Sequence, residues 1–185
     1  MGNESSRSLN PTELSDLRDR TLFSQQEIRE WYKKFHSDCP GGQMNKDEFG
    51  ALFHQIFPKG DATNFADHVF HIYDKDRNGY IDFKEFLCTI SIASRGTIDE
   101  KLRWAFSVYD LDGNGYVTKK EVLDIIEAIF KMRGEHNTEP EKIVAHLFAK
   151  LDKDGDQRLS DIEFILGAKA APELLCILES DKTVT

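Results

Sequence analysis

Three segments of the chain carry oxygen-bearing side chains at one repeated spacing. They read DKDRNGYIDFKE (74–85), DLDGNGYVTKKE (110–121) and DKDGDQRLSDIE (152–163). In each segment, positions 1, 3, 5, 9 and 12 hold a carboxylate, an amide or a hydroxyl, and position 8 is apolar. A hard divalent cation takes six to eight oxygen ligands, and alternating oxygens along a turning loop can supply them. The residues therefore predict three sites for such a cation.

The spacing resembles the calcium loop of an EF-hand, a helix–loop–helix unit called a hand below. In that loop, position 7 gives a backbone carbonyl and Glu at position 12 gives two oxygens, while glycine at position 6 allows a positive φ. We expect Ca²⁺ at all three sites, with Mg²⁺ as the alternative occupant at low calcium. The predicted ligands are Asp74, Asp76, Asn78, Tyr80, Asp82, Glu85, Asp110, Asp112, Asn114, Tyr116, Thr118, Glu121, Asp152, Asp154, Asp156, Arg158, Ser160 and Glu163.

The competing interpretation of these segments is an acidic surface turn, because Asp, Asn and Gly are ordinary turn residues. A single run would leave the two interpretations balanced. Three runs that each close with Glu at position 12 favour metal binding. The last of the three segments, 152–163, carries Gln157 at position 6, where glycine is expected. A side chain at positive φ costs about 1–2 kcal/mol, so we expect this site to fill last.

One more repeat, SDCPGGQMNKDE (37–48), precedes these three and lies in phase with them. In chain order it is the first hand, and the segments at 74–85, 110–121 and 152–163 are the second, third and fourth hands. The loops start at residues 37, 74, 110 and 152, which gives intervals of 37, 36 and 42 residues. Ser37, Cys39 and Gly41 occupy positions 1, 3 and 5 of this repeat, and Pro40 restricts the backbone at position 4. Neutral groups at these positions cannot offset the dehydration of a divalent ion. The first hand is predicted to bind no metal.

Helices must hold the loops, and apolar residues recur at helical spacing on both sides of each loop. Ser24 with Glu27, and Thr97 with Glu100, have capping-box spacing at two helix starts. Because apolar residues at position 8 join loops through short antiparallel bridges, hands occur in pairs. The sequence predicts an all-α fold of two EF-hand pairs, four motifs in all with the first degenerate. The expected parts are an acylated arm with a short helix (1–20), an N-terminal pair (21–95), a C-terminal pair (96–170), and a C-terminal helix and tail (171–185).

Composition narrows the classes of function. The net charge of −9 argues against sequence-independent nucleic-acid binding, which needs clustered basic residues. The chain has neither an apolar run long enough for a membrane span nor a secretory signal. Three widely separated cysteines are typical of free thiols in a reducing compartment. These features favour a cytosolic protein.

Three further motifs carry a family resemblance: CPGGQ (39–43), SRGTIDEKLRWAFSVYDLDGNGY (94–116) and GAKAAPELL (167–175). With them the chain resembles the neuronal calcium sensor family, which includes recoverin, visinin-like proteins, neurocalcin, hippocalcin and frequenin, from Met1 to about Leu178. The resemblance implies an N-myristoylated cytoplasmic sensor that associates reversibly with membranes. It also implies regulation of a protein target bound as an apolar or amphipathic helix, in a kinase, cyclase, channel or exchange factor.

The N-terminal residues independently indicate acylation. Gly2 and Ser6 fit the myristoylation signal M-G-x-x-x-[ST]. Asn3, Glu4 and Arg7 supply almost no basic patch behind the acyl chain. A single myristoyl group binds membranes only marginally. Stable membrane residence is therefore expected to need a second contact, with a protein partner.

The N-terminal half is rich in aromatic residues, which suit either a core or a groove exposed by calcium. We interpret part of this set as a target groove formed by Trp31, Phe35, Phe49, Leu52, Phe53, Phe86 and Ile90.

Two other functions compete with sensing. The sequence contains no H-E-x-x-H, P-loop or G-x-S-x-G motif and no recognisable catalytic Cys–His arrangement, so an enzyme is not expected. A calcium buffer would use the same loops without a groove or an acyl chain. His68 and His71 could bind zinc, and Cys39 could act as a redox sensor. The plain interpretation, polar surface residues and an inert thiol, is favoured for both.

Overall fold

The computed structural model describes residues 9–56, 58, 60–135 and 139–170. Gly2 and the predicted tail at 171–185 therefore lie outside the described residues. Within the described part, nine helices and four short strands follow one another. Their bounds are α1 Pro11–Arg20, α2 Gln25–Asp38, β1 Gln43–Asn45, α3 Lys46–Ile56, α4 Thr63–Tyr73, β2 Tyr80–Asp82, α5 Phe83–Arg95, α6 Ile98–Tyr109, β3 Tyr116–Thr118, α7 Lys119–Arg133, α8 Pro140–Leu151, β4 Arg158–Ser160 and α9 Asp161–Ala170.

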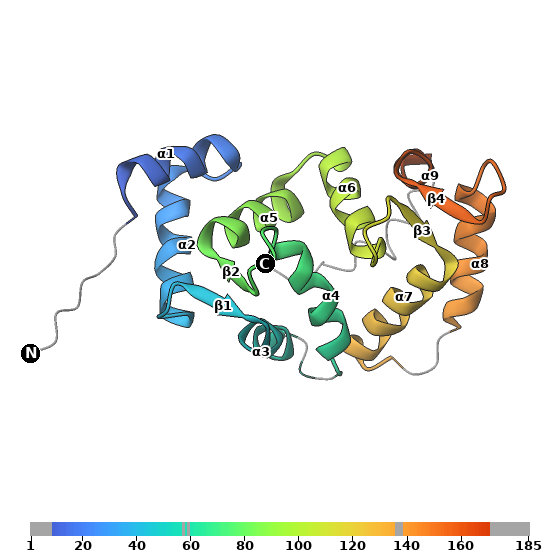
Figure 1. Cartoon of the computed structure of the whole chain (residues 1–185), viewed down its shortest axis with the longest axis horizontal. Coiled ribbons are helices and arrows are strands. Elements are labelled where there is room, and N and C mark those ends of the chain that lie inside the picture. The colour runs from blue at the N-terminus through green and yellow to red at the C-terminus, as the bar shows by residue number, and fades with distance from the viewer. Residues whose placement is uncertain (1–8, 57, 59, 136–138, 171–185) are drawn as a thin grey trace, which may run out of the picture.

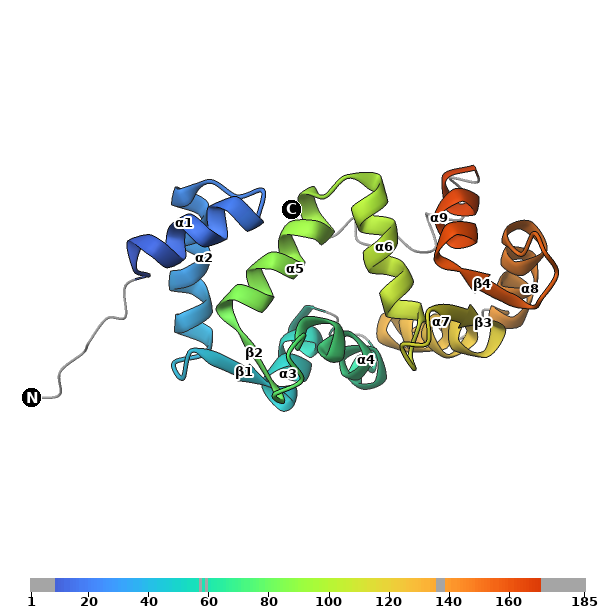
Figure 2. The same ribbon diagram turned by 45° about the horizontal axis from the view of Figure 1, so that its top comes forward.

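The strands join the hands two by two, as the sequence predicts. β1 pairs antiparallel with β2, with Met44 opposite Ile81, and β3 pairs with β4, with Val117 opposite Leu159. All four of these position-8 side chains are buried. The all-α fold of two EF-hand pairs is thus confirmed, and Figures 1 and 2 show one pair toward each end of the molecule.

Local sequence explains where several helices begin. Ser24 caps α2 and Thr97 caps α6, and each forms a capping box with the glutamate three residues on. Two exiting helices use residues of the loops themselves, because Asp82 caps α5 and Thr118 caps α7. Positions 9 and 12 of a loop therefore start the exiting helix as well as serving as predicted ligands.

A backbone contact joins the two pairs at the end of α7. The Asp61 N–H donates to the Lys131 carbonyl at 2.9 Å, and this carbonyl, in the last turn of α7, also accepts from the Gly134 N–H at 3.1 Å. Gly60 lies so close that a Cβ atom there would overlap the carbonyl oxygens of Lys131 and Met132. The segment between α3 and α4 thus clamps the N-terminal pair onto the C-terminal pair.

Candidate metal centres

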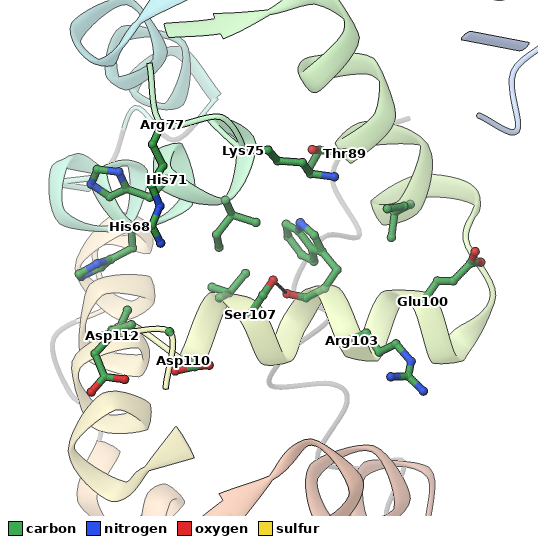
Figure 3. A pocket seen from close by; sticks show the side chains of 16 residues that line it. His68, His71, Lys75, Arg77, Thr89, Glu100, Arg103, Ser107, Asp110 and Asp112 are labelled. Carbon is green, nitrogen blue, oxygen red and sulfur yellow. Dashed lines mark hydrogen bonds between the residues drawn. The ribbon is translucent and has the colours of Figure 1, made fainter. Parts of the chain in front are cut away.

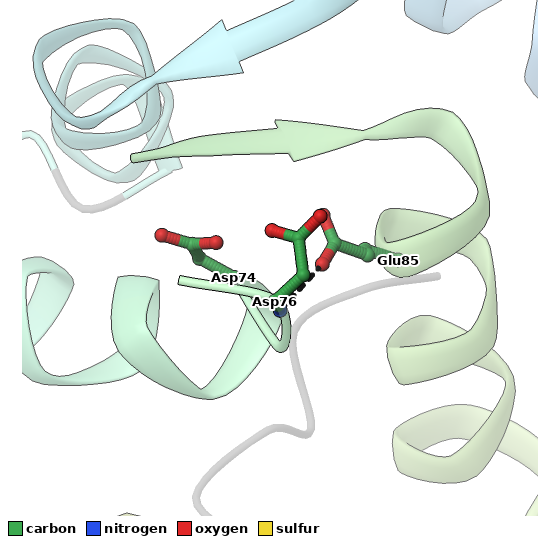
Figure 4. Close-up of side chains that lie close together, drawn as sticks. All are labelled: Asp74, Asp76 and Glu85. Atoms are coloured by element: carbon green, nitrogen blue, oxygen red, sulfur yellow. Dashed lines mark hydrogen bonds between the residues drawn. The ribbon is translucent and has the colours of Figure 1, made fainter. Parts of the chain in front are cut away.

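The second hand gathers three carboxylates around one point. Asp74 is the C-cap of α4, Asp76 follows in the loop, and Glu85 reaches in from the first turn of α5 (Figure 4). One oxygen from each of these side chains lies within 4.8 Å of the others. Asp74 is only 4% exposed. Such a cluster places negative charge where water cannot fully screen it, and a cation would offset that charge.

The third hand repeats this arrangement with Asp110, Asp112 and Glu121, whose oxygens also lie within 4.8 Å of one another. Asp110 is the C-cap of α6, and Glu121 is 8% exposed. An anion at a helix C-terminus opposes the helix dipole. Carboxylate oxygens are also the ligands that Ca²⁺ prefers. The donor set of both hands therefore fits a calcium ion.

Backbone N–H groups fix the carboxylates in these two loops. The N–H groups of Asn78 and Gly79 donate to the two oxygens of Asp74, at 3.0 and 2.9 Å. Glu85 accepts from the Lys75 N–H at 2.9 Å and from the Asp82 N–H at 3.1 Å, which ties the loop start to its end. The third hand has the same four types of bond. The ligand oxygens are thus held in place by the loop backbone.

The fourth hand departs from this pattern. Its compact group consists of Asp152, Asp154 and Asp156, without Glu163. One oxygen of Asp152 accepts from the Gly155 N–H at 2.8 Å, at position 4, where the other two hands use position 5. Glu163 accepts from the backbone and hydroxyl of Ser160, and these bonds lower the pKa of its carboxyl. It is therefore an anion at neutral pH.

The second, third and fourth loops differ in backbone strain, because they place different residues at positions with positive φ. Positions 4 and 6 both have positive φ in all three loops, and the third hand meets this with Gly113 and Gly115. The second hand has Arg77 at position 4, with φ 57°, and the fourth has Gln157 at position 6, with φ 67°. The sequence identified the strain at Gln157 but missed the strain at Arg77, because only position 6 was considered. The third loop is the one without this cost.

We expect Gln157→Gly to tighten the fourth site and Arg77→Gly to tighten the second, each by about tenfold, because each change removes about 1–2 kcal/mol of backbone strain. Calorimetric calcium titration of each variant measures the change. Each variant has an internal control in the other EF-hand pair, namely the third hand for Arg77→Gly and the second hand for Gln157→Gly, and the affinity of that hand should stay the same. An unchanged second and fourth site would show that the strain is absent from the metal-bound loops.

The first hand keeps the scaffold and loses the ligand geometry. α2 continues through Asp38, so Ser37 lies inside a helix, whereas the other entering helices end before position 1. Cys39 is 3% exposed, and burial raises the pKa of its thiol. Asn45 and Glu48 still exchange both bonds of a capping box, at 2.8 and 3.0 Å. The repeat thus pairs with the second hand through β1, and it contributes none of the clusters of metal-type side chains found in the described residues.

The predicted groove residues lie in one aromatic core. Phe35, Phe49 and Phe86 are buried, and the others are partly buried against them. The Trp31 ring lies 5.8 Å from that of Phe86, which lies 5.1 Å from Phe35. The remaining members, on α3 and α5, are Leu52, Phe53 and Ile90. The structure thus brings these side chains together in one hydrophobic cluster, in which three are buried and four are partly buried.

Neither histidine of the zinc hypothesis joins a metal-type cluster in the described part of the chain. The groups of three or more suitable side chains found there are the three loop clusters.

Comparison with known proteins agrees with this geometry. Residues 99–168 match a model for an EF-hand domain pair, and residues 65–91 match an EF-hand domain model. The chain is 44% identical to neuronal calcium sensor 1 of Lymnaea stagnalis over 181 residues, covering 95% of this chain and 94% of the relative. It is 45% identical to the protein of the same name from Aplysia californica, with the same coverage. Human recoverin is 37% identical over 188 residues, covering 97% of this chain and 94% of recoverin.

Proposed function

Because the chain belongs to the neuronal calcium sensor family, we propose that it binds Ca²⁺ at hands two, three and four and none at hand one. The observation that carries this proposal is the contrast among the four loops. Three loops gather acidic oxygens, whereas the first has a helix running through position 1. Mg²⁺ is the alternative occupant of these sites at low calcium.

The proposed response to calcium begins at Glu85. This side chain lies in the first turn of α5, and binding it to an ion in the second loop pulls on the start of that helix. Phe86 and Ile90 lie on the same helix, and Phe86 packs on Trp31 and Phe35 of α2. Movement of α5 separates these rings and exposes an apolar groove. The groove suits an apolar or amphipathic helix of a target such as a kinase, cyclase, channel or exchange factor.

Myristate on Gly2 is proposed to add a membrane contact, so that the protein is cytoplasmic and reversibly membrane-associated. Among the described residues, no helix has the length and apolar character needed to cross a membrane. A single acyl chain gives marginal binding, with a constant of about 10⁴ M⁻¹. The groove and the acyl chain therefore act together at a membrane that carries the target.

Flotation of acylated protein on liposomes tests the two-contact proposal, in calcium and in chelator, with and without a lysate that contains targets. Gly2→Ala should abolish flotation. Trp31→Ala should reduce it substantially when targets are present, because the acyl chain remains and the groove is damaged. Full binding to pure liposomes with no effect of Trp31→Ala would contradict the proposal.

A calcium buffer remains the second candidate, supported by the same acidic loops. A buffer changes shape little, so calcium should leave the binding of a hydrophobic dye unchanged. An increase in dye binding favours the sensor. The relatives are named as sensors, and no catalytic role is proposed.

A further inference from the structure

A pocket of about 560 Å³ lies between the two EF-hand pairs. Figure 3 shows α4, the second loop and α5 on one side of it, and α6 and the third loop on the other. It is distinct from the aromatic core of the N-terminal pair, since none of the predicted groove residues lines it.

Two donors that line this pocket have no partner. The Thr89 hydroxyl and the Trp104 indole N–H form no hydrogen bond with any described residue, although both polar atoms are buried. Thr89 is 1% exposed. Ser91, two residues further along α5, is also buried but accepts from the Leu22 N–H at 2.8 Å. A buried donor without a partner is costly, and an acceptor entering the pocket would remove that cost.

Two of the three lysine and arginine side chains that line the pocket have no salt bridge within the described structure, whereas the third, Arg103, pairs with Asp161. Within the described structure, Lys75 and Arg77 line it and neither forms a salt bridge. The Glu100 carboxylate, which also lines the pocket, accepts from Thr97 through one of its oxygens. The pKa of His68 is lowered, mainly by burial, so this ring adds no charge at neutral pH. Apart from Glu100 and the predicted ligands of the third hand, the charged side chains that line the pocket are the cations Lys75, Arg77 and Arg103.

The rest of the lining is largely apolar. The apolar lining consists of Ile72 of α4, Ile92 of α5, Trp104 and Val108 of α6, and Leu111 of the third loop. Trp104 belongs to α6, whereas Lys75 and Thr89, which Figure 3 labels, come from the second loop and α5. The pocket thus combines a donor-rich region with an apolar surface, a combination typical of small-molecule sites.

We propose that this pocket binds a small amphiphilic anion, namely an organic acid with an apolar body. Its anionic oxygens accept from Thr89, Trp104 and Lys75, and its apolar body lies against Ile72 and Val108. The proposal goes beyond calcium sensing, and it rests on the proposed function in that calcium is expected to hold the carboxylates of Asp110 and Asp112, which also line the pocket. A ligand there contacts both pairs at once and so stabilises their arrangement.

Anilinonaphthalene sulfonate is a suitable probe, and the two tryptophans report where it binds. In ¹H–¹⁵N spectra of calcium-saturated protein, the indole signal that Trp104→Phe removes should shift on titration. The Trp31 signal reports separately on binding in the N-terminal pair. If only the Trp31 signal moves, the dye binds in the aromatic groove and the pocket proposal is wrong.

Variants test the chemistry of recognition. Thr89→Val and Lys75→Met should each weaken the effect on the Trp104 signal by about fivefold, because each removes one donor. Lys101→Met removes the same charge from α6 outside the pocket and should leave binding unchanged. Phenylnaphthylamine, which lacks the sulfonate, should be insensitive to Lys75→Met. Thr89→Val should also raise the melting temperature, since it removes an unpaired hydroxyl. Equal binding by the Lys75 and Lys101 variants would overturn the proposal.

Discussion

Glu121→Gln should remove calcium binding at the third hand. The side chain contributes a buried carboxylate to the cluster, with Asp110 and Asp112 as the other members. In the occupied loop, the Glu121 carboxylate and the calcium ion would form a buried charge pair. Loss of one partner from such a pair costs about 3 kcal/mol, or roughly a hundredfold in affinity for calcium. Glutamine can still accept from the Thr118 N–H, so the start of α7 is kept. Calorimetric titration should therefore lose one site from a protein that remains folded.

The fourth site should weaken in the same variant. Val117 of the third loop pairs directly with Leu159 of the fourth, and both side chains are fully buried. Loss of the ion from the third loop should therefore also weaken calcium binding in the fourth. Glu48→Gln is the matched control, because Glu48 holds the same cap in the first hand. That change should leave the number of sites unchanged. Three sites in the Glu121 variant, or a site lost with Glu48→Gln, would contradict the assignment of the loops.

Gly60→Ala should loosen the contact between the two pairs. Its φ does not lie in the left-handed region, so alanine can adopt the backbone conformation. The added Cβ overlaps the carbonyls of Lys131 and Met132, and backbone cannot move aside as a flexible side chain can. We expect a loss of about 1–3 kcal/mol in the free energy of unfolding. Scanning calorimetry measures this loss, and small-angle scattering should show a larger radius of gyration.

Gly50→Ala is the matched control for this change. Gly50 lies within α3, and a Cβ atom there meets nothing within 4 Å. Alanine in a helix is more stable than glycine by about 0.5–1 kcal/mol. The two substitutions should therefore shift stability in opposite directions. A stabilising Gly60→Ala would show that the clamp is absent in solution.

Local spacing predicted much of the fold. The pairing of Met44 with Ile81 follows from counting to position 8, and the caps at Ser24 and Thr97 follow from residues three apart. The strain at Gln157 follows in the same way from position 6. These features depend on a few neighbouring residues, so their chemistry can be seen in the printed sequence.

Features that depend on packing between distant segments were not predicted. The contact of Gly60 with α7 joins residues about 70 positions apart in the chain, and no local pattern indicates it. The unpartnered state of Thr89 and Trp104 depends on how α5 and α6 meet. The sequence could also not show that Phe35, Phe49 and Phe86 are buried together, because the same aromatic spacing serves a core or a groove.

Quenching of Trp31 fluorescence tests most directly whether calcium opens the N-terminal pair. Trp104→Phe leaves Trp31 as the one tryptophan of the chain, which has two. Its ring packs on Phe86 of α5 and on Phe23, so it reports on the contact that calcium is proposed to break. Acrylamide quenching should rise as calcium fills the sites, and Glu85→Gln should suppress this rise. If quenching is the same in calcium and in chelator while calorimetry shows the ions bound, the protein is a buffer and not a sensor.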